Sequence, residues 1–166
     1  MKGPTFRQKL WLPLLASLLC LGAMAVADVM EARELRYAER RAGLADVAKS
    51  ALTIVQGFAA DADAGRLSVP EAQARAKAVL NNMRYADDGY IAILGVDARA
   101  IQNPGKPEND GKDMSTFRNE EGIYVFRDIA RLAASPAGEG YLSYLWQRPG
   151  RAQASTKLAR DRKSVV

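Results

Sequence analysis

The chain has 166 residues, of which 48% are hydrophobic and 26% are charged, so it holds one modest domain and whatever precedes it. It contains no histidine and a single cysteine, which excludes Ser-His-Asp and Cys-His catalytic sites, His-ligated metal sites and an intrachain disulfide. The formal net charge is +5, but three cations precede an apolar run near the start and two lie in the last six residues. Residues 28–160 are therefore nearly neutral and lack the concentrated basic face that a nucleic-acid partner needs.

Residues 10–27 read LWLPLLASLLCLGAMAVA, a run of 18 residues without a charge. At about 1.5 Å per residue this run nearly crosses a hydrocarbon core of about 30 Å as a helix, and Pro13 falls in its first turn, where a helix tolerates proline. Basic residues precede the run and acidic residues follow it, so the positive-inside rule places residues 1–9 in the cytoplasm and the rest outside. A cleavable signal peptide is the alternative, because Ala23-Met24-Ala25 is a small-x-small pattern, but the length of the run favours an uncleaved anchor.

The lack of proline and the apolar spacing predict a long helix over residues 28–62 that continues the membrane helix outward. Residues 31–41 within it are dominated by charge, which fits either a solvated stalk or a weakly packed helix pair between two copies of the chain. Ser68 and Glu71 form a capping box, with a proline between them in the first turn, and predict a second helix over residues 69–83.

After the second helix the pattern changes to short apolar runs separated by turn residues, as is typical of strands. Helices in front of antiparallel strands define an α+β domain. The predicted order is a strand at residues 90–94, a strand at 100–102, a loop at 104–119, a helix at 123–133, a strand at 141–146, a hairpin connection at 148–150 and a returning strand at 154–159.

Several short motifs occur in a fixed order along this part of the chain. They are RYADDGY at residues 84–90, NPGKPE at 103–108, DGKD at 110–113, FRDI at 126–129, GEGYLSYLW at 138–146 and RPG at 148–150, followed by Lys157. Together they make residues 35–160 resemble the single Cache sensor domain, type 2, of bacterial methyl-accepting chemotaxis proteins. The resemblance implies a transmembrane helix, a periplasmic sensor domain with a PAS-like antiparallel sheet, a returning transmembrane helix and cytoplasmic signalling segments.

The sequence departs from the family pattern in two ways. Asn103 precedes Pro104 where the family usually has histidine, so an amide replaces the imidazole. The chain also stops where the family continues into a further strand, so we expect a PAS-like sheet that lacks its last strand. The final residues, 161–166, have the sequence that the DNA string gat-cgg-aag-agc-gtc-gtg encodes, and this string matches a common sequencing adapter. We therefore expect residues 161–166 to be a non-native tail. Residues 28–160 are then an incomplete sensor domain.

The resemblance places the ligand pocket between the entry to the first strand and the facing hairpin. An anionic acid group is held best by one fixed guanidinium or ammonium together with neutral donors in an otherwise apolar cup. We therefore expect Arg84 or Lys157 to take the acid group, and the aromatic residues to shape the space for its tail. Each residue also has a purely structural explanation, since aromatic residues are common in cores and Arg84 can pair with Asp87 or Asp88. The six candidate ligand-binding residues are Arg84, Tyr85, Tyr90, Tyr144, Trp146 and Lys157.

The sequence thus predicts a membrane-anchored, extracytoplasmic sensor of a small organic acid, which pairs with a second copy through the long helices of the intact receptor. The same input domain could instead feed a histidine kinase or a cyclic-dinucleotide enzyme. An anchored periplasmic binding or scaffold protein is the alternative from another class. Neither an enzyme nor a metal or cofactor is expected, because histidine is absent and the adjacent carboxylates Asp87-Asp88 and Glu120-Glu121 rarely converge on one bond.

Overall fold

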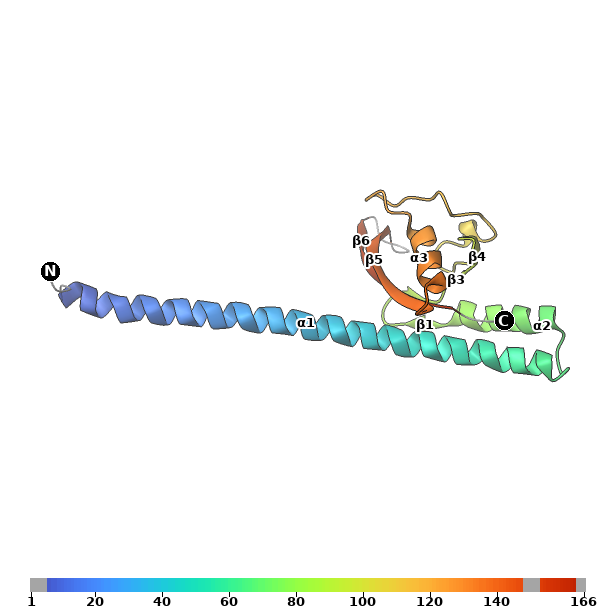
Figure 1. The fold of residues 1–166 in the computed structure, drawn as a ribbon, viewed down its shortest axis with the longest axis horizontal. Helices are drawn as coiled ribbons and strands as arrows, with labels where there is room; N and C mark the ends of the chain where they lie inside the picture. Colours follow the sequence, from blue (N-terminus) through green and yellow to red (C-terminus); the bar gives the residue numbers. More distant parts are fainter. Residues whose placement is uncertain (1–5, 148–152, 164–166) are drawn as a thin grey trace. The chain divides into compact units, whose positions relative to one another are not determined.

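The computed structural model describes residues 6–147 and 153–163, and it divides the chain into two compact units, Met1–Ala42 and Gly43–Val166. The boundary between the units falls inside α1 (Phe6–Asp63), the helix that includes the predicted membrane segment (Figure 1). Because α1 begins before residue 10, Pro13 lies inside the helix and not in its first turn, which corrects the prediction. A proline at an interior position removes one helical hydrogen bond, a loss that membrane helices tolerate.

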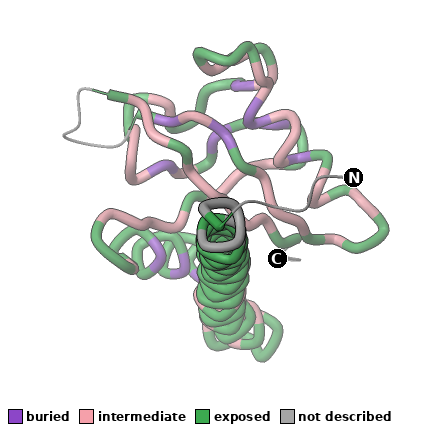
Figure 2. Tube along the Cα trace, turned by 90° about the vertical axis from the view of Figure 1, so that its left-hand side faces the viewer, coloured by how far each residue is buried: buried purple, intermediate pink, exposed green. Residues whose placement is uncertain are grey.

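Exposed apolar side chains characterise the first unit. Every residue of it whose burial the structure describes is exposed, including Leu18 and Leu19, and the tube of Figure 2 is accordingly green along this part of α1. An 18-residue window in Pro13–Asp63 has a mean hydropathy of 1.9, and none of that window is buried. By length and composition, α1 can cross a membrane.

Two further helices belong to the second unit, α2 (Val69–Asn82) and α3 (Val125–Ala134). Half of the predicted capping box of α2 is present: Ser68 Oγ accepts a hydrogen bond from the Glu71 N–H at 3.4 Å, whereas Glu71 Oε1 accepts one from Arg75 Nη2 at 2.7 Å. The buried face of α2 is formed by residues at every fourth position, Ala72, Ala76 and Leu80. α3 starts two residues later than predicted, and the short 3₁₀ helix η1 (Pro107–Asn109) lies in the segment that the sequence predicted as a loop.

The strands of the second unit form three antiparallel pairs: β1 (Arg84–Tyr85) with β2 (Gly89–Tyr90), β3 (Ile93–Leu94) with β4 (Ala100–Gln102), and β5 (Glu139–Gln147) with β6 (Ala154–Arg162). The α+β class is therefore confirmed, but the described strands form separate pairs in place of one continuous sheet.

The prediction of one strand over residues 90–94 is wrong for a physical reason. Tyr90 pairs back to Arg84 across a tight turn, whereas Ile93 pairs with Gln102, so the segment changes partner between residues 90 and 93. The hairpin strands are longer than predicted, and β6 continues into the expected tail as far as Arg162. The predicted hairpin connection at 148–150 lies outside the described residues.

The hydrophobic core of the second unit lies where α3 packs against β5 and where the β3–β4 region meets them. Figure 2 shows buried segments in purple in this part of the unit as well as on α2. The core cluster consists of Ala98, Ala100, Met114, Val125, Phe126, Ala130, Tyr144 and Trp146. It thus includes two of the six residues that the sequence proposed for ligand binding.

Ala86, in the turn between β1 and β2, has a φ of 49°, which is left-handed backbone that favours glycine. Ala86 is exposed, so its methyl group contributes little packing. We expect Ala86→Gly to raise the free energy of unfolding by about 1 kcal/mol, because it relieves the clash of Cβ with the backbone. Chemical denaturation measures the effect, and Ala74→Gly on the exposed face of α2 is the matched control, expected to lower stability by about 1 kcal/mol. Equal losses at both positions would contradict the prediction.

Candidate functional site

A cavity of about 520 Å³ lies within the second unit. Residues of α1, α2, β3, β4, α3, β5 and β6 line it, and most of them are apolar. Among the described lining residues one is acidic, Asp161, and five are basic: Lys77, Lys157, Arg160, Arg162 and Lys163. The size is typical of a small-molecule site, and the charge balance of the wall favours an anion over a cation.

β5 contributes the aromatic wall of the cavity. Tyr144 and Trp146 lie two residues apart, so strand alternation puts both on one face, and both line the cavity. Their rings meet edge to face at 5.8 Å between centroids, and Trp146 makes similar contacts with Phe117 and Phe126. Trp146 is 5% exposed. These two residues are therefore core residues and cavity residues at once.

The register of the hairpin brings a cation to this wall. Lys157 on β6 is the partner of Tyr144 on β5, and its Nζ lies 3.9 Å from the centroid of the Tyr90 ring and 5.9 Å from that of Trp146. An ammonium over an aromatic face is attracted by the ring quadrupole. Lys157 is thus held among three aromatic side chains that line the cavity with it.

Neutral donors accompany this ammonium. Burial raises the pKa of the Tyr90 and Tyr144 hydroxyls, so both phenols stay protonated at neutral pH. The indole N–H of Trp146 is near enough to the Tyr90 oxygen to oppose this rise in the pKa of Tyr90, yet Nε1 is buried without a hydrogen bond of normal geometry in the described chain. A buried donor without an acceptor is costly, and a ligand oxygen would satisfy it.

Five of the six predicted site residues line the cavity, Tyr85, Tyr90, Tyr144, Trp146 and Lys157. Arg84 does not. Its side chain is exposed, and its Nη1 donates to the carbonyls of Asn81 at 2.6 Å and Met83 at 2.9 Å, near the end of α2. This arrangement is that of a helix C-terminal cap, so the geometry separates the two candidate acid-binding groups and brings only Lys157 to the cavity.

The segment between β4 and η1 contributes residues for which the sequence predicted no role in the site. Asn103 is 4% exposed and lines the cavity, and the Lys106 Nζ lies 5.0 Å from the centroid of the Trp146 ring. The sequence offered one signal, because Asn103 stands at a position of the family motif. Periodicity could not identify these residues, since a loop has none.

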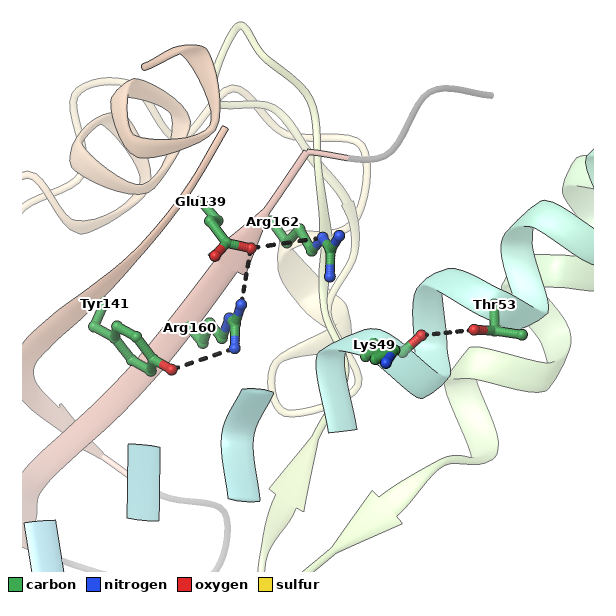
Figure 3. Close-up of polar contacts among 6 residues, drawn as sticks. All are labelled: Lys49, Thr53, Glu139, Tyr141, Arg160 and Arg162. Carbon is green, nitrogen blue, oxygen red and sulfur yellow. Dashed lines mark hydrogen bonds and ion pairs between the residues drawn. The ribbon is translucent and has the colours of Figure 1, made fainter. Parts of the chain in front are cut away.

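An ion-pair cluster, consisting of Glu139, Tyr141, Arg160 and Arg162, ties β5 to β6 (Figure 3). Glu139 Oε2 lies 2.8 Å from Arg160 Nη2 and 3.6 Å from Arg162 Nε, and Arg160 Nη1 donates to the Tyr141 hydroxyl at 3.3 Å. The Arg160 side chain is only 10% exposed. Its Nη1 and Nη2 are therefore engaged within the hairpin.

Asp161 opposes Gly140 in the hairpin, and its Oδ2 is buried without a hydrogen-bond partner in the described chain. Burial raises the pKa of this carboxyl to about 6. The folded state therefore binds the proton more tightly than the unfolded state, and the associated stability is present below the unfolded pKa of 3.8 and is lost as pH rises through about 6.

We expect Asp161→Asn to raise the melting temperature at pH 7.5 and to flatten the dependence of the melting temperature on pH between 4 and 7. Thermal melts across this range measure it; Glu108→Gln, at an exposed position, is the control, and an unchanged slope for Asp161→Asn would contradict the prediction.

The fold and the cavity define the class of an α+β ligand-binding domain joined to an apolar helix. The profile of the Single Cache domain 2 family matches residues 37–164, and the chain belongs to this family. Two solved structures are similar to the chain. One, a periplasmic sensor domain of a chemotaxis protein, has a TM-score of 0.70 and 29% identity over 74% of this chain and 85% of its own. The other, a Cache chemosensory domain solved for carboxylic acid recognition, has a TM-score of 0.71 and 26% identity over 76% of this chain and 86% of its own.

Relatives of known class agree with this assignment. The methyl-accepting chemotaxis protein McpP of Pseudomonas putida is 29% identical over 162 residues, which are 96% of this chain and 29% of the relative. The sensor histidine kinase MctS of Rhizobium johnstonii is 27% identical over 88 residues, 53% of this chain and 19% of the relative. The chain thus spans less than a third of the length of these relatives. It corresponds to a Cache sensor domain of the kind that chemotaxis receptors carry.

Proposed function

We propose that this chain is the extracytoplasmic input domain of a membrane-anchored receptor and that it binds a small carboxylic acid. The observation that carries the proposal is the convergence, in the lining of the cavity, of the Lys157 ammonium and the Trp146 N–H, which makes no hydrogen bond of normal geometry in the described chain. One charged and one neutral donor can hold the two oxygens of a carboxylate. A similar Cache domain, 26% identical, recognises carboxylic acids, which supports the same ligand class here.

The proposed location follows from the first unit. Its exposed apolar helix would cross the inner membrane of a bacterium once within residues 10–27, with residues 1–9 in the cytoplasm and the sensor domain in the periplasm. A similar solved structure is a periplasmic sensor domain, which supports this orientation. In the intact receptor, the charged residues 31–41 would face a second copy of the chain, and acid binding would shift the balance between two arrangements of the paired helices.

The signalling output has two candidates. Chemotaxis is the first, because a methyl-accepting chemotaxis protein matches across nearly the whole chain. A histidine kinase is the second, because one such kinase matches about half of it. The domain itself would bind and not catalyse in either case. The genomic reading frame beyond residue 160 distinguishes them, since a methyl-accepting signalling segment and a kinase domain differ in sequence.

A direct test of the ligand class compares an acid with its uncharged isostere. We expect propionate to raise the melting temperature of the full chain in detergent, since saturation at 100 times Kd stabilises a protein by about 2.7 kcal/mol. Propionamide, which has the same shape without the charge, should give no shift at the same concentration, because the amide offers the Lys157 ammonium no negative charge. Equal shifts with both compounds, or none with any acid of a panel from acetate to succinate, would refute the proposed ligand class.

A further inference from the structure

The turn at residues 103–106 is fixed by hydrogen bonds of one buried residue, Asn103. Asn103 N–H donates to Asp110 Oδ1 at 2.6 Å, and Asn103 Oδ1 accepts from the Gly105 N–H at 3.2 Å. The Asn103 carbonyl accepts from the Lys106 N–H at 2.9 Å. The position of Gly105 is therefore determined from both sides, and this part of the chain cannot move away cheaply from whatever it contacts.

Gly105 lies directly against the phenol of Tyr90. A Cβ at residue 105 would overlap the ring carbon Cζ and the hydroxyl oxygen of Tyr90. The φ of Gly105 is outside the left-handed range, so backbone conformation does not require glycine here. The close approach of the phenol is the reason that no side chain fits.

Of Gly105 and Tyr90, only Tyr90 reaches the cavity. Tyr90 lines the cavity and Gly105 does not, and on the cavity side the Lys157 Nζ lies 3.9 Å from the centroid of the Tyr90 ring. Any group added at Gly105 therefore displaces the phenol toward Lys157 and the aromatic wall. The far end of a tyrosine side chain can rotate, so the displacement changes the shape of the cavity more than it disturbs the fold.

We propose that Gly105 is a specificity-determining residue: by leaving room for the Tyr90 phenol, it sets the space beside Lys157 and hence the length of acid that the cavity accepts. This inference rests on the proposed function, because it names the group that selects among carboxylic acids at the same site. Gly105 contacts no ligand itself and acts through Tyr90, so its substitution should change selectivity more than it changes the binding of the smallest acid.

The test uses the full chain in detergent with Trp11→Phe, which leaves Trp146 as the only tryptophan and its emission as a reporter of the site. Acetate, propionate and butyrate are titrated into this background and into its Gly105→Ala variant. We expect Gly105→Ala to weaken butyrate binding about tenfold relative to acetate, the effect of about one methylene in an apolar pocket. Gly57→Ala is the matched control, because its added methyl group meets no atom within 4 Å in the described chain.

The double variant Gly105→Ala/Tyr90→Leu shows whether the effect passes through the phenol. With the ring removed, the added methyl group should no longer alter the ratio of butyrate to acetate affinity, so the two changes should be strongly non-additive. Tyr90→Leu alone should shift selectivity toward the longer acid, a result that is informative even if Gly105→Ala does not fold. A Gly105→Ala protein that keeps the selectivity of its parent, or additive effects in the double variant, would overturn the inference.

The binding data distinguish a failure of the proposed function from a failure of the inference on Gly105. If the parent binds none of the three acids, the ligand class is wrong and the specificity role of Gly105 is overturned with it. If the parent binds them and only the selectivity shift is missing, the proposed function stands and this inference alone is overturned. Trp146 emission without any acid reports the displaced phenol separately, since it should change with Gly105→Ala and not with Gly57→Ala.

Discussion

Replacing Lys157 by methionine should weaken the binding of propionate roughly ten- to hundredfold while leaving the domain folded. A hydrogen bond to a charged group contributes about 1.5–3 kcal/mol, and Lys157 is the cation that the hairpin register places among Tyr90, Tyr144 and Trp146. Methionine keeps most of the apolar stem, so packing against the Tyr90 ring is largely retained. Isothermal titration calorimetry of the full chain in detergent measures the loss.

The matched control is Lys112→Met, which removes the same charge from an exposed position outside the cavity wall. It should leave propionate affinity within the error of the measurement. Propionate affinity that survives Lys157→Met would show that the acid group is held elsewhere.

Arg84→Met should lower the free energy of unfolding by about 1 kcal/mol, because Arg84 Nη1 caps carbonyls near the end of α2.

Helices of this chain were predictable because their signals are local. Ser68 and Glu71 predict the start of α2 without knowledge of the rest of the fold, and Ser68 Oγ caps the helix as expected. The strands were less predictable, because residues 90–94 are apolar throughout while their pairing changes from Arg84 to Gln102. Hydrophobicity reports burial, and it does not report which strand is the partner.

The site residues likewise divide into those that local sequence or family resemblance could predict and those that it could not. Tyr144 and Trp146 could be placed on one face from strand alternation, and the family resemblance added Tyr85, Tyr90 and Lys157, all of which line the cavity. Arg84 is adjacent to Tyr85 in sequence but points the other way along β1, toward the end of α2. The contact of Gly105 with Tyr90 was not predictable, since it joins residues of different elements by shape alone.

Two substitutions of Trp146 are expected to distinguish its role in core packing from its role in ligand recognition. Its ring contacts Phe117, Phe126 and Tyr144 at centroid distances of 5.9, 6.0 and 5.8 Å, so Trp146→Ala should cost about 3–5 kcal/mol of a total stability of about 5–15 kcal/mol. We expect this variant to lose its cooperative thermal transition. Trp146→Phe keeps an aromatic ring in the core, with a smaller volume, and removes the N–H donor, so it should melt cooperatively and bind propionate about tenfold more weakly. A Trp146→Phe protein with unchanged affinity would mean that the buried indole N–H serves no ligand, and the carboxylate would then depend on Lys157 alone.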